Sequence, residues 1–470
     1  MSDALLNLSL TEVAEAIRSR KVSAVEVTRA CIARAEKVQR KLNCFIALEA
    51  EDALKAAREA DLRITKREKL GPLHGVPLAH KDMLYREGKI STCGSKILRN
   101  YRADKTATVV ERLDQAGAIW LGNLNMAEFA ANPTGHNEHW GHCRNPWNPA
   151  HISGGSSSGS GSAVGARACY GALGSDTGGS ARIPAAACGV VGIKPTYGRI
   201  SRYAILPRSW SQDTVGPLTR SVRDCARMTR VIAGADVRDA TCSSEPVPDY
   251  ERDITAGIRG LKIGVPRNHF YHGITPEIEQ LMSESLRAFR SLGAKLVDVA
   301  VPDPQKLFLL SNTLSICEAA TMHAGWMRTR PQDYSLMVRS RVEAGLHIPA
   351  ASYLEALNLR AHFLREFVAT VFDKCEVLHT PLLAMPVPTI AETTVGASSE
   401  VPALIARITR NARPFNYLGT PALSVPAGFS ANGLPVALQL VARPFAESLL
   451  FRAGHAYQSV TDWHRRMPQL

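Results

Sequence analysis

Residues 174–184 read Gly-Ser-Asp-Thr-Gly-Gly-Ser-Ala-Arg-Ile-Pro, and this stretch places Ser180 directly after two glycines. Because glycine has no Cβ, the backbone N–H groups of such a turn can come close to a bound molecule. Successive N–H groups in a turn also form a concavity that attracts negative charge. Acyl transfer requires a nucleophilic hydroxyl beside such donors. The stretch therefore predicts a loop with a nucleophile and an oxyanion hole, although an ordinary turn can have the same composition.

Two other segments supply groups that such a serine would need. Residues 153–161 form a second loop rich in Ser and Gly, and Gly75-Val-Pro-Leu-Ala-His-Lys-Asp82 places Lys81 at the end of an expected strand. Burial among apolar neighbours lowers the pKa of a lysine, so the neutral amine becomes available as a base. Lys194, in Gly-Ile-Lys-Pro-Thr (192–196), also follows a buried-looking segment. The residues alone leave both lysines open as the base.

The loop 153–161 allows other interpretations. Gly155-Ser-Ser-Ser-Gly159 matches the G-x-S-x-G nucleophile elbow, with Ser157 as the nucleophile. That motif requires an apolar strand immediately before it, and residues 145–152 do not form one. A flexible linker is disfavoured because apolar residues 163–168 follow at once. The loop is therefore expected to lead into a packed element.

Three histidines and a cysteine lie close together in the chain, at His136, His139, His142 and Cys143. Imidazole and thiolate are ligands that suit zinc. The segment is loop-like, however, and has neither a paired Cys spacing nor an H-E-x-x-H helix. We expect no metal here.

The composition is that of an ordinary soluble globular protein, with 45% hydrophobic and 21% charged residues in 470. The net charge of +13 allows a basic, non-enzymatic scaffold that binds nucleic acid, but Lys and Arg are scattered and no nucleic-acid-binding motif accompanies them. The ten cysteines show no CxxC pair. No signal peptide or membrane span is apparent, so a cytoplasmic enzyme with reduced thiols is expected.

The order of elements predicts an α/β protein. Helices are expected over residues 9–65, where Ser9-x-x-Glu12 and Ser23-x-x-Glu26 match the capping box. The catalytic core is expected over residues 66–235, and within it residues 106–131 are expected to form a helix, a strand and a second helix. A polar loop or linker is expected to follow at 236–258. Residues 259–465 are expected to complete the sheet and shape the pocket, with a largely helical interval at 305–373.

Three segments together resemble the amidase signature family: GVPLAHKD (75–82), SGGSSSGSGSAVGA (153–166) and GSDTGGSARIPAAACGVVGIKPTYGRIS (174–201). GTPALSVPAGF (419–429) and GLPVALQLV (433–441) fit as well, so the similarity covers nearly the whole chain. The resemblance implies one amidase domain over residues 1–470, folded as an α/β/α sandwich around a large mixed twisted sheet. It also implies a reaction without metal or organic cofactor.

The resemblance further implies a Ser–Ser–Lys triad, with Ser180 as nucleophile and Lys81 as base. Ser156 would relay the proton, because it stands at the family's usual spacing of 24 residues before Ser180. The oxyanion hole would consist of the backbone N–H groups of Thr177, Gly178, Gly179 and Ser180. Lys194, Arg182 and Asp213 would be structural. Ser158 and Ala437 depart from the family pattern, which generally has glycine at both positions.

The resemblance leaves two roles, a stand-alone amidase and the glutamine-hydrolysing amidase component of a tRNA-dependent amidotransferase. Arg341 resembles the arginine with which that component holds the substrate carboxylate, and Tyr203 and Trp210 are further candidate substrate contacts. Residues 407–414 contain no acidic residue to hold the ammonium of glutamine, and Lys81 is followed by Asp-Met-Leu instead of the common Asp-Asn-Ile. We therefore expect a stand-alone amidase that hydrolyses a small amide to a carboxylate and ammonia or an amine. The sequence leaves a homodimer open.

Overall fold

The computed structural model describes residues 2–470, and its centre is a mixed sheet of eleven strands in the order β1-β3-β2-β4-β6-β5-β10-β11-β9-β7-β8. Parallel and antiparallel pairs both occur, as in β2 with β4 and β10 with β11. The strands are β1 (Phe45–Leu48), β2 (Pro77–Lys81), β3 (Ile119–Leu124), β4 (Gly171–Asp176), β5 (Val191–Lys194), β6 (Thr214–Thr219), β7 (Lys262–Pro266), β8 (Lys295–Val299), β9 (Val377–Pro381), β10 (Ala422–Phe429) and β11 (Pro435–Val441).

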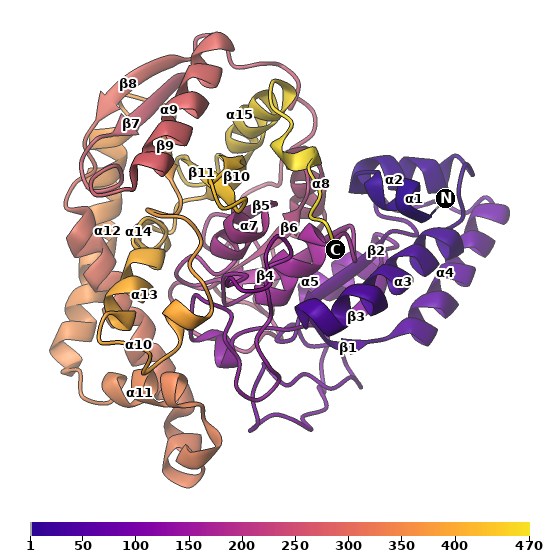
Figure 1. Cartoon of the computed structure of the whole chain (residues 1–470), viewed down its shortest axis with the longest axis horizontal. Coiled ribbons are helices and arrows are strands. Elements are labelled where there is room, and N and C mark those ends of the chain that lie inside the picture. The colour runs from indigo at the N-terminus through magenta and orange to yellow at the C-terminus, as the bar shows by residue number, and fades with distance from the viewer. Residues whose placement is uncertain (1) are drawn as a thin grey trace.

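Helices flank this sheet (Figure 1). One group, α6 and α7, packs on the central strands, while α8, α9 and α15 form another group against β5, β6, β10 and β11. Helices α1–α4 gather beside β1–β3, and α10–α12 lie at the opposite side of the molecule (Figure 1). The α/β class and the α/β/α sandwich are confirmed. The helices are α1 (Ser2–Asn7), α2 (Leu10–Arg18), α3 (Ala24–Leu42), α4 (Ala50–Thr65), α5 (Thr108–Gln115), α6 (Ser158–Gly165), α7 (Arg182–Cys188), α8 (Val222–Ile232), α9 (Pro276–Ser291), α10 (Pro304–Thr329), α11 (Leu336–Gly345), α12 (Ala350–Val371), α13 (Val401–Thr409), α14 (Arg413–Leu418) and α15 (Glu447–Ser459).

Local signals in the N-terminal segment predicted the helix starts correctly. Both capping boxes form, with the Ser9 side chain accepting from the Glu12 amide and the Ser23 side chain accepting from the Glu26 amide. The all-helical expectation for residues 9–65 was nevertheless wrong, because β1 lies between α3 and α4. This strand pairs with β3, a partner far along the chain that local periodicity cannot show.

Two other expectations also need correction. The helix predicted near residues 126–131 is only a short 3-10 turn, Glu128–Ala130, in which Phe129 has a φ of 48°. Residues 236–258 have no helix or strand, but Tyr250, Ile254 and Ile258 are buried, so the segment packs on the core and is not a free linker.

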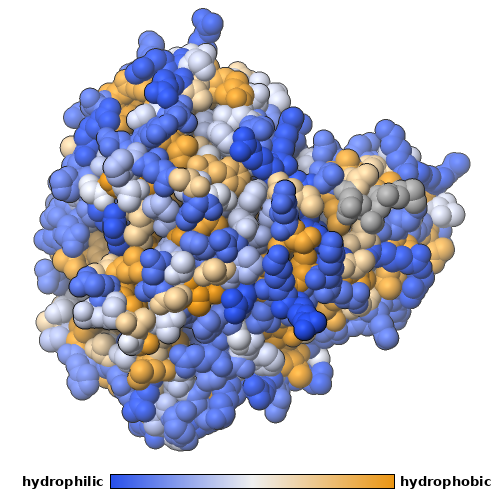
Figure 2. Space-filling model, in the orientation of Figure 1, coloured by the Kyte–Doolittle hydropathy of each residue, from blue (hydrophilic) through white to orange (hydrophobic). Residues whose placement is uncertain are grey.

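The face of the molecule drawn in Figure 2 is mostly polar. Hydrophilic side chains cover much of the face in Figure 2, and apolar residues are scattered between them. No helix within residues 2–470 is long and apolar enough to cross a membrane.

The sheet brings the first two parts of the site together. Strands β2 and β4 pair in parallel, with Ala79 opposite Ala172 and His80 opposite Leu173. Lys81 ends β2, and Ser175 and Asp176 end β4. Because parallel strands end at the same edge of a sheet, these polar side chains lie next to each other.

Candidate active site

The Ser180 loop connects β4 to α7 and is held from within by a carboxylate. Asp176 Oδ1 accepts from the Gly179 N–H at 2.8 Å, and Oδ2 accepts from the Ala181 N–H at 3.2 Å. The carboxylate also pairs with the Arg182 guanidinium, with Nε 2.9 Å from Oδ2, and both side chains are fully buried. Burial alone would raise the pKa of Asp176, but Arg182 and the hydrogen bond from Asn416 hold it well below its usual range.

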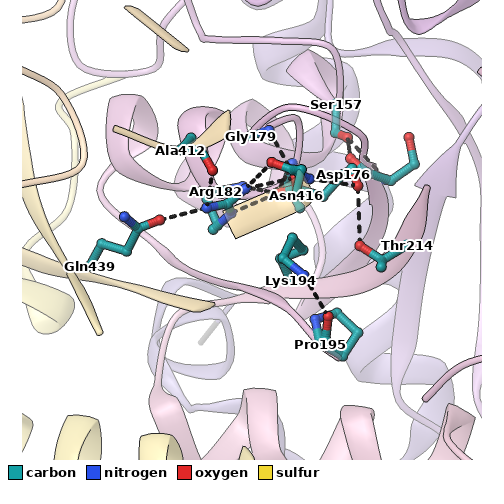
Figure 3. A network of polar contacts seen from close by, with 12 residues as sticks. Ser157, Asp176, Gly179, Arg182, Lys194, Pro195, Thr214, Ala412, Asn416 and Gln439 are labelled. Carbon is teal, nitrogen blue, oxygen red and sulfur yellow. Dashed lines mark hydrogen bonds and ion pairs between the residues drawn. The ribbon is translucent and has the colours of Figure 1, made fainter. Parts of the chain in front are cut away.

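The buried ion pair is part of a larger network that fixes the loop to distant segments (Figure 3). Arg182 donates to Gln439 Oε1 at 2.6 Å and to Asn416 Oδ1 at 2.7 Å. Asn416 Nδ2 in turn donates to Asp176 Oδ1 at 2.7 Å. The loop is thereby tied to α14 and β11, more than 230 residues later in the chain. Arg182 has the structural position expected of it, whereas sequence reasoning did not single out Asp176, Asn416 or Gln439.

Lys81 contacts two serines in a fully buried setting. Its Nζ lies 2.6 Å from Ser156 Oγ and 2.8 Å from Ser175 Oγ. Burial lowers the pKa of Lys81 to about 7, although Asp213 and Asp176 act in the opposite direction. Sequence reasoning missed Ser175, which stands within the decisive stretch 174–184.

The other lysine considered as base has different surroundings. Lys194 is also buried, and burial, with Arg182 nearby, lowers its pKa to about 7. Its Nζ donates to the carbonyl of the adjacent Pro195 at 2.9 Å (Figure 3). Lys81 is thus the lysine that contacts Ser156, and Lys194 points toward a backbone carbonyl.

The Ser156 loop and the Ser180 loop are joined through their backbones. Ser157 N–H donates to the Ser180 carbonyl at 3.2 Å, and the Gly155–Ser156 peptide is cis. The Ser157 hydroxyl is occupied by the Ser175 backbone, donating to its carbonyl and accepting from its N–H, both at 3.2 Å. Ser158 begins α6 and donates to the carbonyl of Asn125. The loop leads directly into a packed helix, as predicted.

Ser180 opens onto a small, narrow cavity of about 30 Å³. Thr177 and Gly178 of the same loop line it, together with Arg341 of α11. The structure therefore brings Arg341 beside Ser180. Five further polar side chains line it, namely Asn132, Arg208, Ser315, Thr409 and Arg413.

Tyr203 and Trp210 lie elsewhere. They line a separate cavity of about 280 Å³, together with Met83, Ser175 and Asp213. Ser175 contacts Lys81, and Asp213 accepts from Thr177, so this second cavity borders residues that contact the base and the Ser180 loop. The two aromatic residues are not brought together with Ser180 and Arg341.

The histidines at 136, 139 and 142 serve local contacts. His136 and His142 stack with their ring centres 4.6 Å apart, and His139 Nε2 lies 3.0 Å from Glu128 Oε1. Within residues 2–470, no group of three or more His, Cys, Asp or Glu side chains is arranged to hold a metal ion.

Comparison with known proteins agrees with this geometry. The family described as Amidase matches residues 26–451. The chain belongs to the amidase signature family. A curated relative, the A subunit of the Glutamyl-tRNA(Gln) amidotransferase of Roseiflexus sp., is 40% identical and aligns with 99% of each chain.

Two solved structures share the whole fold. The 6-aminohexanoate cyclic dimer hydrolase superposes with a TM-score of 0.90 at 29% identity and covers 99% of both chains. The A subunit of the Glutamyl-tRNA(Gln) amidotransferase of Thermotoga maritima superposes with a TM-score of 0.79 at 30% identity, covering all of this chain and 96% of the other. These relatives include a hydrolase and amidotransferase subunits. Membership of the amidase family makes this chain an amidohydrolase, and the relatives do not decide its substrate.

Proposed function

We propose that the protein hydrolyses a carboxylic amide to a carboxylate and ammonia through a Ser180 acyl-enzyme, with Ser156 as proton relay and Lys81 as base. The contact between Lys81 Nζ and Ser156 Oγ, 2.6 Å long in a fully buried setting, carries this proposal. A lysine whose pKa lies near 7 is about half neutral at neutral pH, which general base catalysis requires. The backbone bond from Ser157 to Ser180 supports the relay, because it holds the two loops together.

The proposed reaction begins when neutral Lys81 accepts the Ser156 proton while Ser156 accepts the proton of Ser180. Ser180 Oγ attacks the amide carbonyl, and the C–N bond breaks after the proton returns through Ser156 to the nitrogen. Ammonia leaves, and water repeats the cycle on the acyl-enzyme to release the carboxylate. Ser175 is a positioning residue in this scheme, because it holds Lys81 Nζ from the other side.

We assign the oxyanion hole to the N–H groups of Thr177, Gly178 and Ser180. Gly179, the fourth donor implied by the family, already donates to Asp176 at 2.8 Å. The hydrogen bond from Gly179 to Asp176 fixes the orientation of the Gly178–Gly179 peptide and thereby constrains its neighbours in the loop. Donors fixed before the reaction stabilise a developing oxyanion without having to reorganise.

The first candidate role is a stand-alone amidase for a free small amide, and the cavity beside Ser180 supports it. Among the described residues, the cavity lining contains no carboxylate to hold the ammonium of glutamine. The second candidate is the glutamine-hydrolysing component of a tRNA-dependent amidotransferase. The curated relatives favour this second role over the first, with 37–40% identity over 98–99% of the chain to such proteins.

Ammonia release from a panel of aliphatic, aryl and amino-acid amides tests the proposal. The wild type should be active alone, and Ser180→Ala should lose about 10⁴-fold or more in kcat. Unchanged activity in Ser180→Ala would refute the acyl-enzyme. Glutaminase activity that arises only after partner proteins are added would assign the second role.

A further inference from the structure

The cavity beside Ser180 contains three guanidinium groups, from Arg208, Arg341 and Arg413. Arg341 donates to the Ala131 carbonyl at 2.5 Å, and Arg208 donates to the Ser315 carbonyl at 3.3 Å. Arg413 Nε and one of its Nη atoms are buried and have no hydrogen-bond partner among residues 2–470. Buried charges are normally paired, so a site with this much unpaired positive charge is expected to bind an anion.

Three carboxylates favour the charged form of Arg413 or Arg208, and each of them is also held by other groups. Asp176 pairs with Arg182. Asp213 accepts from Thr177 Oγ at 2.5 Å and from the backbone N–H groups of Arg208 and Ser209 at 2.8 Å. Glu318 accepts from Ser209 Oγ at 2.5 Å.

The pKa values of these arginines reflect their burial and the repulsion between their guanidinium groups. Burial, with Arg341 and Arg208 acting in the same direction and Asp176 opposing them, lowers the pKa of Arg413 to about 9. Burial also lowers the pKa of Arg208 to about 10, with Arg341 acting in the same sense and Asp213 and Glu318 in the opposite one. Arg341 thus disfavours the charged form of both other arginines, and the carboxylates offset this only in part.

Arg413 is also close to the reacting group. A Cβ placed on Gly178 would lie 3.1 Å from the Arg413 Cζ, so the guanidinium packs directly on the loop that carries Ser180. An anionic group held by Arg413 would therefore lie beside the loop that carries the nucleophile. Because Arg413 and Ser180 line the same small cavity, an acyl chain that joins the two must be short.

We propose that the substrate is the monoamide of a short dicarboxylic acid, with a free carboxylate held between Arg413, Arg208 and Arg341 and with no ammonium group. This inference rests on the proposed function. Arg341 is the carboxylate contact that the sequence suggested; the additional carboxylate contacts are Arg208 and Arg413. Hydrolysis breaks the amide C–N bond and releases ammonia and the dicarboxylate.

Three five-carbon amides test this charge requirement directly. Glutaramate carries one carboxylate, glutamine adds an ammonium to the same chain, and glutaramide replaces the carboxylate with a neutral amide. The wild-type kcat/KM for glutaramate should exceed both others by about 30-fold or more, the effect of one buried charged contact. Arg413→Gln should remove most of this preference. Arg407→Gln, on the same segment but outside the cavity, is the matched control.

A binding measurement keeps the test independent of catalysis. Calorimetry on Ser180→Ala should show glutaramate binding, and Ser180→Ala/Arg413→Gln should bind it at least about 30-fold more weakly. Equal activity of the wild type on all three amides would overturn the anion requirement and leave the amidase proposal standing. Arg413-dependent binding without ammonia release by wild type would support the anion site and overturn the proposed hydrolysis. No binding of glutaramate to Ser180→Ala would overturn the anion site.

Discussion

The protonation of Lys81 should control the activity of this enzyme below neutral pH. Burial moves its pKa from 10.5 to about 7. At pH 7 about half of the Lys81 side chains are then neutral, against roughly one in 3,000 at the ordinary value. The shift raises the available base by about 10³-fold, and it corresponds to about 5 kcal/mol of disfavoured ammonium.

The expected profile of log kcat/KM has a slope of one at low pH and a plateau above about pH 7, measured by ammonia release on a substrate without groups that titrate there. Lys81→Ala should lose this acid limb and about 10²- to 10⁴-fold of the activity. Lys81→Arg should be equally inactive, because a guanidinium does not give up its proton. Lys194→Met is the matched control and should keep the limb. If the limb persists in Lys81→Ala and disappears in Lys194→Met, Lys194 is the base and our reasoning is wrong.

Stability provides a second readout of the same shift. Between about pH 7 and 10.5 the unfolded chain binds the Lys81 proton and the folded chain does not, so this group makes stability rise with pH across that window. Below about pH 7 the full cost of the buried ammonium is present. Lys81→Met should therefore raise the free energy of unfolding by several kcal/mol at pH 6 and by much less at pH 10. The loss of the hydrogen bonds to Ser156 and Ser175 reduces the gain at both pH values. An equal effect at both pH values would refute the shift.

Three further changes follow from the contacts around the loop. Asp176→Asn leaves the buried Arg182 without a charged partner and should lower the free energy of unfolding by about 3–5 kcal/mol in urea titrations; an unchanged midpoint would show that the pair is dispensable. Gly178→Ala places a Cβ 3.1 Å from Arg413 and should reduce kcat/KM for glutaramate more than for glutaramide, with equal losses counting against the proposed contact. Thr409→Asp adds a carboxylate to the cavity wall and should shift the ratio of glutamine to glutaramate hydrolysis by about 10-fold or more toward glutamine, and an unshifted ratio would contradict the charge argument.

Local sequence signals predicted the elements that depend on local chemistry. The two capping boxes and the polar loop that leads into α6 are short-range features, and each is present. Local sequence patterns gave the wrong element where a distant partner determines the secondary structure. The four residues of β1, for example, form a strand by pairing with β3. The expected helix near residues 126–131 is replaced by a short turn for a similar reason. The Ser156 carbonyl accepts from the Ala127 N–H just before the turn, and the Cys93 carbonyl accepts from the Phe129 N–H within it.

The residues of the candidate site likewise fall into those that local sequence motifs predicted and those that depend on distant contacts. The spacing of Lys81, Ser156 and Ser180 is visible in the sequence, and the structure brings Lys81 to Ser156. Ser175 was overlooked because nothing in a sequence says which strand lies beside β2. Arg208 and Arg413 were overlooked because their side chains reach the cavity from segments more than 200 residues apart.

Two buried arginines contact the Ser180 loop and differ in their hydrogen-bond partners. This difference distinguishes an arginine that stabilises the loop from one that is available to bind substrate. Arg182 is satisfied by Asp176, Asn416 and Gln439, so its charge holds the loop and attracts nothing further. Arg413 packs against the same loop with two nitrogens unpartnered, which costs stability in the empty enzyme. Such a cost is offset when an anion binds, and binding to the folded state alone should then raise the melting temperature. The unpaired arginine is therefore the group whose partner is the substrate.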